Sequence, residues 1–154
     1  MSNYTISQKN YDTLDKNMNI VFVSAEFNKP FIEQLENINQ AFLEKQGFRN
    51  IHKYSVPGAF EIPGFVSKIL HSQHIDMILI FWVVIRGATT HYEIISEESA
   101  RWLMDISLHL PIHTTLINGI LTCENQQQVQ ERISDTYARS WLNLALETLK
   151  INNQ

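Results

Sequence analysis

An apolar run, Ile78–Ile85, sets the strongest limit on what this chain can fold into. The run is too short to cross a membrane and too long for a turn, and it is rich in β-branched and aromatic residues. It therefore predicts a strand that is buried on both faces. Arg86 and Gly87 end the run, and a helical pattern begins at about His91.

The turn after this strand has two interpretations. Free N–H groups of Gly87, Ala88 and Thr89 at the start of a helix could hold a phosphate, helped by the helix dipole. His91 follows at once, and histidine is the side chain that exchanges protons near neutral pH. The alternative is a strand–turn–helix corner with a surface histidine, and this stretch alone does not separate the two.

Composition narrows the function classes. The chain has 154 residues, 44% of them hydrophobic, which suits one domain with a sizeable core. Its 12 basic and 16 acidic residues form no basic stripe, which argues against a nucleic-acid partner. With no membrane-length apolar run and no signal peptide, we expect no membrane association and a cytoplasmic location. The single cysteine, Cys123, fits a reducing compartment and is expected to be a small buried residue rather than a nucleophile.

Strand and helix patterns alternate along the rest of the chain. We predict further strands at residues 19–24, 51–56 and 112–121. Helices are predicted at residues 28–46, 65–70, 91–110, 126–133 and 141–149, with Asn28 capping the first of them. This order predicts an α/β fold, a flavodoxin-like three-layer α/β/α sandwich around a four-stranded parallel sheet. Residues 1–18 are predicted to be a tail, or an arm that adds to a neighbour's sheet, and residues 19–150 the domain.

Ligands of such sheets bind beyond the carboxyl ends of the strands. Four informative segments are expected to meet there: Phe27-Asn28, Ala59–Glu61, Gly87–His91 and Leu121-Thr122. Their convergence favours a functional site more strongly than any one of them does alone.

Taken together, these turns resemble those of the lumazine synthase family. The matching pieces span about residues 19–150 in the family's order: Phe27-Asn28, Val56–Pro63, Val84–His91, Leu121-Thr122 and Glu131-Arg132. The resemblance implies condensation of 5-amino-6-(D-ribitylamino)uracil with 3,4-dihydroxy-2-butanone 4-phosphate. The products are 6,7-dimethyl-8-ribityllumazine, phosphate and water, in the penultimate step of riboflavin biosynthesis. It implies no metal and no organic cofactor.

The resemblance also assigns roles to residues of this chain. His91 would transfer protons, and Phe27 would stack on the pyrimidine ring. Other contacts to the pyrimidine and its ribityl chain would come from Ala59, Phe60, Glu61, Val83, Val84, Ile85 and Asn118. The phosphate would be held by Ala88, Thr89 and Arg132, with Arg132 coming from a neighbouring subunit, and Arg139 would stand in for a family lysine. Each residue also has a structural alternative, such as a helix cap for Glu61 or a solvated charge for Arg132.

This chain departs from the family at several positions. Many members carry an aromatic residue where Asn118 stands, and Trp82 occupies a usual glycine position. Because of these departures, the alternative interpretation is a divergent lumazine- or flavin-binding protein of the same fold, with weak or no catalysis. A flavodoxin-like binding module has less support, because the turn after the first strand lacks a phosphate-gripping cluster. A metal enzyme is also disfavoured, since neither His71 and His74 nor His109 and His113 have a third ligand.

The resemblance implies small-molecule substrates and a homo-oligomer, which can be a pentamer, a decamer or a sixty-subunit shell. The stretch after Arg132 is about one residue shorter than in the family and lacks its glycines. We therefore expect a pentamer or a pair of pentamers rather than a shell. The resemblance further implies association with riboflavin synthase.

Overall fold

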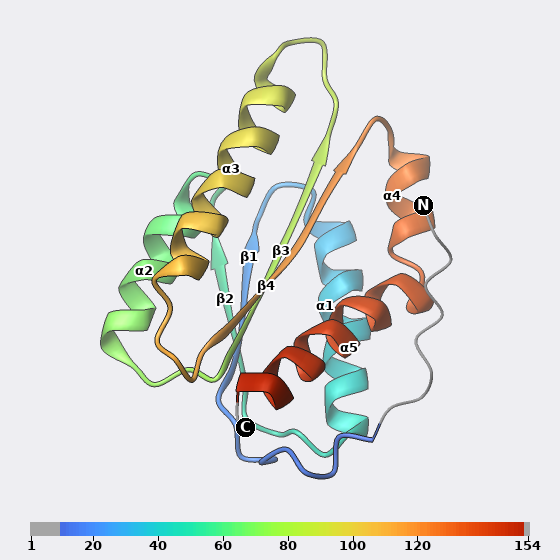
Figure 1. Cartoon of the computed structure of the whole chain (residues 1–154). Helices are drawn as coiled ribbons and strands as arrows, with labels where there is room; N and C mark the ends of the chain where they lie inside the picture. Colours follow the sequence, from blue (N-terminus) through green and yellow to red (C-terminus); the bar gives the residue numbers. More distant parts are fainter. Residues whose placement is uncertain (1–9, 153–154) are drawn as a thin grey trace.

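The computed structural model describes residues 10–152, with the side chains of residues 135–139 excepted. Its strands are β1 (Ile20–Ala25), β2 (Ile51–Val56), β3 (Met77–Ile85) and β4 (Thr115–Cys123). Its helices are α1 (Lys29–Lys45), α2 (Glu61–Ser72), α3 (His91–Leu108), α4 (Gln126–Arg132) and α5 (Asp135–Asn152). This order confirms the α/β alternation predicted from the sequence (Figure 1).

The four strands form one parallel sheet in the order β2-β1-β3-β4. Helices α2 and α3 cover one face, and α1, α4 and α5 cover the other (Figure 1). The interior strands are buried almost throughout, as the apolar run predicts, whereas the edge strand β4 is buried at every second residue. Within residues 10–152, no helix is both long enough and apolar enough to cross a membrane.

The element boundaries differ from the predicted ones where turn residues intervene. Helix α2 begins at Glu61, so Pro63 lies in its first turn, where a missing N–H breaks no intrahelical hydrogen bond. Strand β4 begins at Thr115 and not at residue 112, because Pro111 starts a turn in which its carbonyl accepts from the Thr114 N–H at 2.9 Å.

Part of the segment predicted as a tail belongs to the core. Tyr11, Leu14 and Met18 are buried, and the Tyr11 hydroxyl donates to Oδ1 of Asn143 in α5 at 2.7 Å. Burial, with a smaller contribution from the charge of Glu147, raises the pKa of Tyr11 to about 12. These residues show no helical or strand period, which is why the sequence suggested a tail. The predicted arm otherwise falls on residues 1–9, outside the described residues.

Gly119 permits the close pairing of β3 and β4, and its replacement by alanine is expected to destabilise the fold. A Cβ at this position would lie 2.5 Å from the carbonyl oxygen of Ile80 and 3.2 Å from Cδ1 of Phe81. We expect Gly119→Ala to lower the free energy of unfolding by about 1–3 kcal/mol, measured by denaturant titration. Gly64→Ala is the matched control, because nothing lies within 4 Å of its Cβ and alanine favours helix α2. An unchanged midpoint for Gly119→Ala would contradict this packing argument.

Candidate functional site

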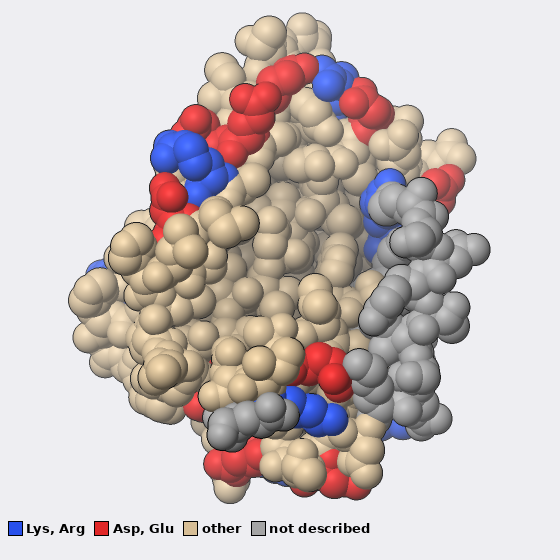
Figure 2. Space-filling view, in the orientation of Figure 1, with Lys and Arg blue, Asp and Glu red and all other residues tan. Residues whose placement is uncertain are grey.

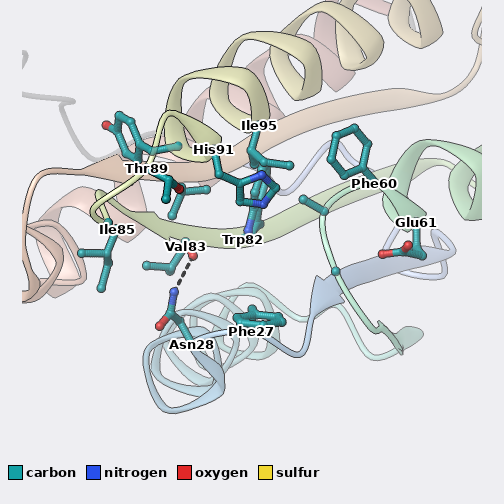
Figure 3. A pocket seen from close by; sticks show the side chains of 15 residues that line it. Phe27, Asn28, Phe60, Glu61, Trp82, Val83, Ile85, Thr89, His91 and Ile95 are labelled. Atoms are coloured by element: carbon teal, nitrogen blue, oxygen red, sulfur yellow. Dashed lines mark hydrogen bonds between the residues drawn. The ribbon is translucent and has the colours of Figure 1, made fainter.

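A cavity of about 360 Å³ opens at the carboxyl ends of β1, β2 and β3 (Figure 3). Its walls come from the turns that follow these strands and from the start of α3. The predicted site residues that line it are Phe27, Ala59, Phe60, Glu61, Val83, Val84, Ile85, Thr89 and His91. The end of β4, at Leu121-Thr122, does not contribute to this wall. A cavity of this volume suits a small organic ligand.

Two phenylalanine rings at the cavity are exposed to solvent. The side chain of Phe27 is 73% exposed and that of Phe60 is 46% exposed, which is unusual for phenylalanine. Phe27 lies on one side of β3 and His91 on the other (Figure 3). The Phe60 ring is held by Trp102 of α3, with ring centroids 4.9 Å apart. Exposed rings at a concave site offer flat apolar faces for a planar ligand.

Asn28 lies at the N-cap position of α1, but its side chain does not make the cap hydrogen bond expected there. Its backbone is left-handed, with φ at 61°, and its side chain makes no cap hydrogen bond to α1. The Nδ2 group instead donates to the carbonyl oxygen of Val83 at 2.8 Å (Figure 3). Asparagine tolerates the left-handed region, so this turn can hold the end of β3 in place. The predicted N-cap position of Asn28 is therefore confirmed, but its side chain does not make the cap hydrogen bond.

Glu61 presents a carboxylate to the cavity from the first turn of α2. It is exposed, and a Cβ on Gly58 would lie 3.0 Å from its Oε2 atom, so the glycine leaves room for this carboxylate. An ionised carboxylate only accepts hydrogen bonds, which makes Glu61 suited to a ligand rich in hydroxyl groups.

His91 is the first residue of α3, and Thr89 precedes it on the same cavity wall. Thr90, at the helix N-cap, makes no side-chain cap hydrogen bond. A helix start attracts anions, because its first amide groups have no partner within the helix. The imidazole of His91 therefore lies beside a position that favours a negatively charged group.

Arg86 fixes the turn that carries His91, a role that the sequence did not reveal. Its guanidinium donates to Oε1 of Glu93 in α3 and to Oε2 of Glu124 after β4, the latter at 2.6 Å. Its Cζ atom lies 4.4 Å from the ring centre of Tyr92. These hydrogen bonds raise the pKa of Arg86 and lower that of Glu93. Since Tyr92 and Glu93 follow His91 directly, Arg86 sets the position of the first turn of α3.

Three other predicted residues, Ala88, Asn118 and Arg132, do not line this cavity. Ala88 is exposed between two lining residues, and Asn118 is exposed on β4, where its Oδ1 accepts from the Ile120 N–H at 2.9 Å. Arg132 ends α4 near Cys123: burial raises the pKa of the Cys123 thiol, and the charge of Arg132 opposes that rise. Arg139 falls in α5 among the residues whose side chains are not described. Within one chain, the structure therefore does not bring Asn118 or Arg132 to the cavity.

Comparison with known proteins identifies the family. A model of the 6,7-dimethyl-8-ribityllumazine synthase family matches residues 17–153. A protein of that name from Limosilactobacillus reuteri is 37% identical over 113 residues, 73% of each chain. Another from Campylobacter jejuni subsp. doylei is 35% identical over 77% of each chain, and one from Gemmatimonas aurantiaca is 33% identical over 86% of this chain and 80% of its own. This chain belongs to the 6,7-dimethyl-8-ribityllumazine synthase family, transferases of riboflavin biosynthesis.

Proposed function

We propose that this chain condenses 5-amino-6-(D-ribitylamino)uracil with 3,4-dihydroxy-2-butanone 4-phosphate to give 6,7-dimethyl-8-ribityllumazine, phosphate and water. The observation that carries the proposal is a single cavity that joins Phe27, Glu61, Thr89 and His91 from three separate turns. Together these residues offer a stacking face, a polyol acceptor, a phosphate position and a proton carrier.

The chemistry follows from these groups. The ring amine attacks the ketone of the butanone phosphate and forms an imine as water leaves. Loss of a proton from carbon then expels phosphate with its bonding electron pair. The enol left by this elimination tautomerises to a ketone as its terminal carbon takes up a proton. The ribityl-bearing nitrogen then closes the ring on that new ketone, and a second water leaves. Each step moves a proton, and we assign these transfers to His91, with Phe27 and Glu61 holding the pyrimidine and Thr89 holding the phosphate.

Mixing the protein with both substrates tests the proposal directly. Formation of the fluorescent lumazine, well above the rate in a protein-free control, is expected.

The second candidate is a lumazine-binding protein without catalysis, for which the exposed amide of Asn118 in place of an aromatic wall is the supporting observation. Tight binding of the lumazine with no rate above the control would favour this candidate. We also propose a cytoplasmic location, which the free and buried thiol of Cys123 fits.

We further propose that the site is completed by a neighbouring subunit in a pentamer or a pair of pentamers. Asn118 and Arg132 lie outside the cavity of their own chain, so another chain must supply them if they act on the substrates. Figure 2 shows a hollowed face between α3 and α4 with few charged side chains. The edge strand β4 crosses this face, with Leu116 and Ile120 only half-buried. A surface of this kind suits contact with a second copy.

This assembly predicts that activity belongs to the oligomer. In light scattering coupled to an activity assay, we expect the active species to have the mass of a pentamer, or of two pentamers, of the 17.9-kDa chain. Dilution that yields monomers should raise the KM for the butanone phosphate at least as much as Arg132→Ala does, because Arg132 would then be absent from every cavity. A fully active monomer would overturn the shared site.

A further inference from the structure

Trp82 is the bulkiest side chain on the cavity wall, and its indole N–H has no hydrogen-bond partner among the described residues. The residue is 4% exposed, yet it lines the cavity beside Val83 and His91. Among the residues whose side chains are described, none accepts a hydrogen bond from the Trp82 indole N–H. The indole nitrogen also keeps some solvent-accessible surface, since it is not one of the fully buried polar atoms that lack a partner. The N–H group is therefore not sealed inside the protein, and the residue that carries it lines the cavity.

Strand geometry explains why this side chain faces the cavity. Successive residues of a strand point to opposite faces. Phe81 packs edge-on against Phe22 of β1, with ring centroids 5.1 Å apart, on the face that α1 covers. Trp82 must then point to the other face, beneath α3, and Figure 3 shows it on the same side of β3 as His91 and Ile95.

A tryptophan as deeply buried as this one usually donates its N–H to a partner, because an unsatisfied donor away from bulk water is costly. Among the described residues, no neighbouring polar group accepts from this N–H, and this includes Thr89 and His91 on the same wall. The carbonyl of Val83 accepts from Asn28 on the Phe27 side of β3, and the Glu61 carboxylate lies on the Phe60 side of the cavity (Figure 3). A bound ligand can supply the missing acceptor oxygen.

We propose that Trp82 is a specificity-determining residue, whose indole N–H donates to a hydroxyl oxygen of the ribityl chain. This inference rests on the proposed function, because it takes the polyol-bearing pyrimidine as the ligand. Glu61 accepts from hydroxyl hydrogens and Trp82 donates to a hydroxyl oxygen, so the two would contact different hydroxyl groups along one polyol chain. The indole also limits the width of the cavity, which disfavours ligands with a branched chain in place of ribityl.

Binding of two ligands to Trp82→Phe tests the hydrogen bond. The probes are 6,7-dimethyl-8-ribityllumazine and its 8-ethyl analogue, which lacks the hydroxyl groups, with affinities measured by calorimetry. Phenylalanine keeps an aromatic ring but removes the N–H. We expect the variant to bind the ribityl compound about two- to tenfold more weakly, the loss that corresponds to one neutral hydrogen bond, and to bind the ethyl compound as the wild type does. Equal losses for both ligands, or no loss for either, would overturn the proposal.

Steady-state kinetics give an independent measure of the same interaction. The KM of Trp82→Phe for the ribitylamino substrate should rise by the same factor, while its KM for the butanone phosphate should not change. Trp141→Phe, on α5 and away from the cavity, is the matched control and should raise neither KM. A purely structural role for Trp82 would instead change both KM values together.

A third measurement does not depend on how well Trp82→Phe folds. The chain has three tryptophans, so the ¹⁵N-labelled protein has three indole N–H signals, and Trp102→Phe and Trp141→Phe assign the third to Trp82. Saturation with the ribityl lumazine should move the Trp82 signal downfield, and the 8-ethyl compound should not.

Two outcomes separate this inference from the proposed function. Turnover by the wild type with no ribityl-dependent effect would reject only the role of Trp82. Ribityl-dependent binding without turnover would reject only the catalysis.

Discussion

His91→Ala is expected to lower kcat by up to about 10²–10⁴-fold while leaving measurable turnover and near-normal binding of both substrates. General acid–base catalysis contributes about this much in enzymes. Holding two reactants side by side can contribute roughly 7–11 kcal/mol, and the alanine variant keeps that contribution. Initial rates with both substrates, and product binding by calorimetry, measure the two effects separately.

The pH dependence of the rate provides a second readout for His91. The pH–rate profile of His91→Ala should become flatter than that of the wild type, because the variant lacks the side chain to which we assign the proton transfers. His109→Ala is the matched control, since His109 is exposed at the opposite end of the same helix α3. If His91→Ala retained the wild-type rate and profile, His91 would have no part in the mechanism.

Arg132→Ala is expected to raise the KM for the butanone phosphate about ten- to hundredfold and to change the KM for the pyrimidine much less. A hydrogen bond between a guanidinium and a phosphate is charge-assisted and contributes about 1.5–3 kcal/mol. Steady-state titration of each substrate, with the other saturating, measures this difference. Arg101→Ala is the control, because Arg101 is exposed on α3 and pairs with Glu98 and Asp105.

Mixed assemblies show which chain supplies the arginine. If Arg132 acts in a neighbour's cavity, co-refolded His91→Ala and Arg132→Ala chains should form some cavities with both wild-type groups. Such mixtures should be more active than either variant alone. Equal KM changes for both substrates, together with no gain on mixing, would remove Arg132 from the phosphate site.

The features that the sequence predicted well are those that local patterns encode. The apolar run predicted a buried β3, and the small residues after it predicted the turn before α3. Most of the cavity wall followed from turns at the strand ends, because parallel strands bring these ends to one edge. Family resemblance then assigned roles that periodicity alone would have left open.

Features that depend on distant partners could not be predicted in this way. Asn28 matched a helix cap locally, but its partner is a carbonyl of β3. Arg86 appeared to be only the end of a strand, whereas its partner Glu124 lies 38 residues further along the chain. Tyr11 lay in a polar, aperiodic segment, and only the contact with α5 makes it part of the core. A single sequence gives no signal for such pairs.

The contact between Asn28 and Val83 has a consequence for synthesis of the chain. These residues are 55 positions apart, so at about 5–20 residues per second the ribosome adds Val83 several seconds after Asn28. During that interval β1 can pair with β2, but its other edge has no partner, and an open edge invites aggregation. The cavity does not exist until β3 inserts beside β1. Substrates therefore cannot assist the nascent chain before that insertion, and ligand-dependent stabilisation begins only once the central pair of strands has formed.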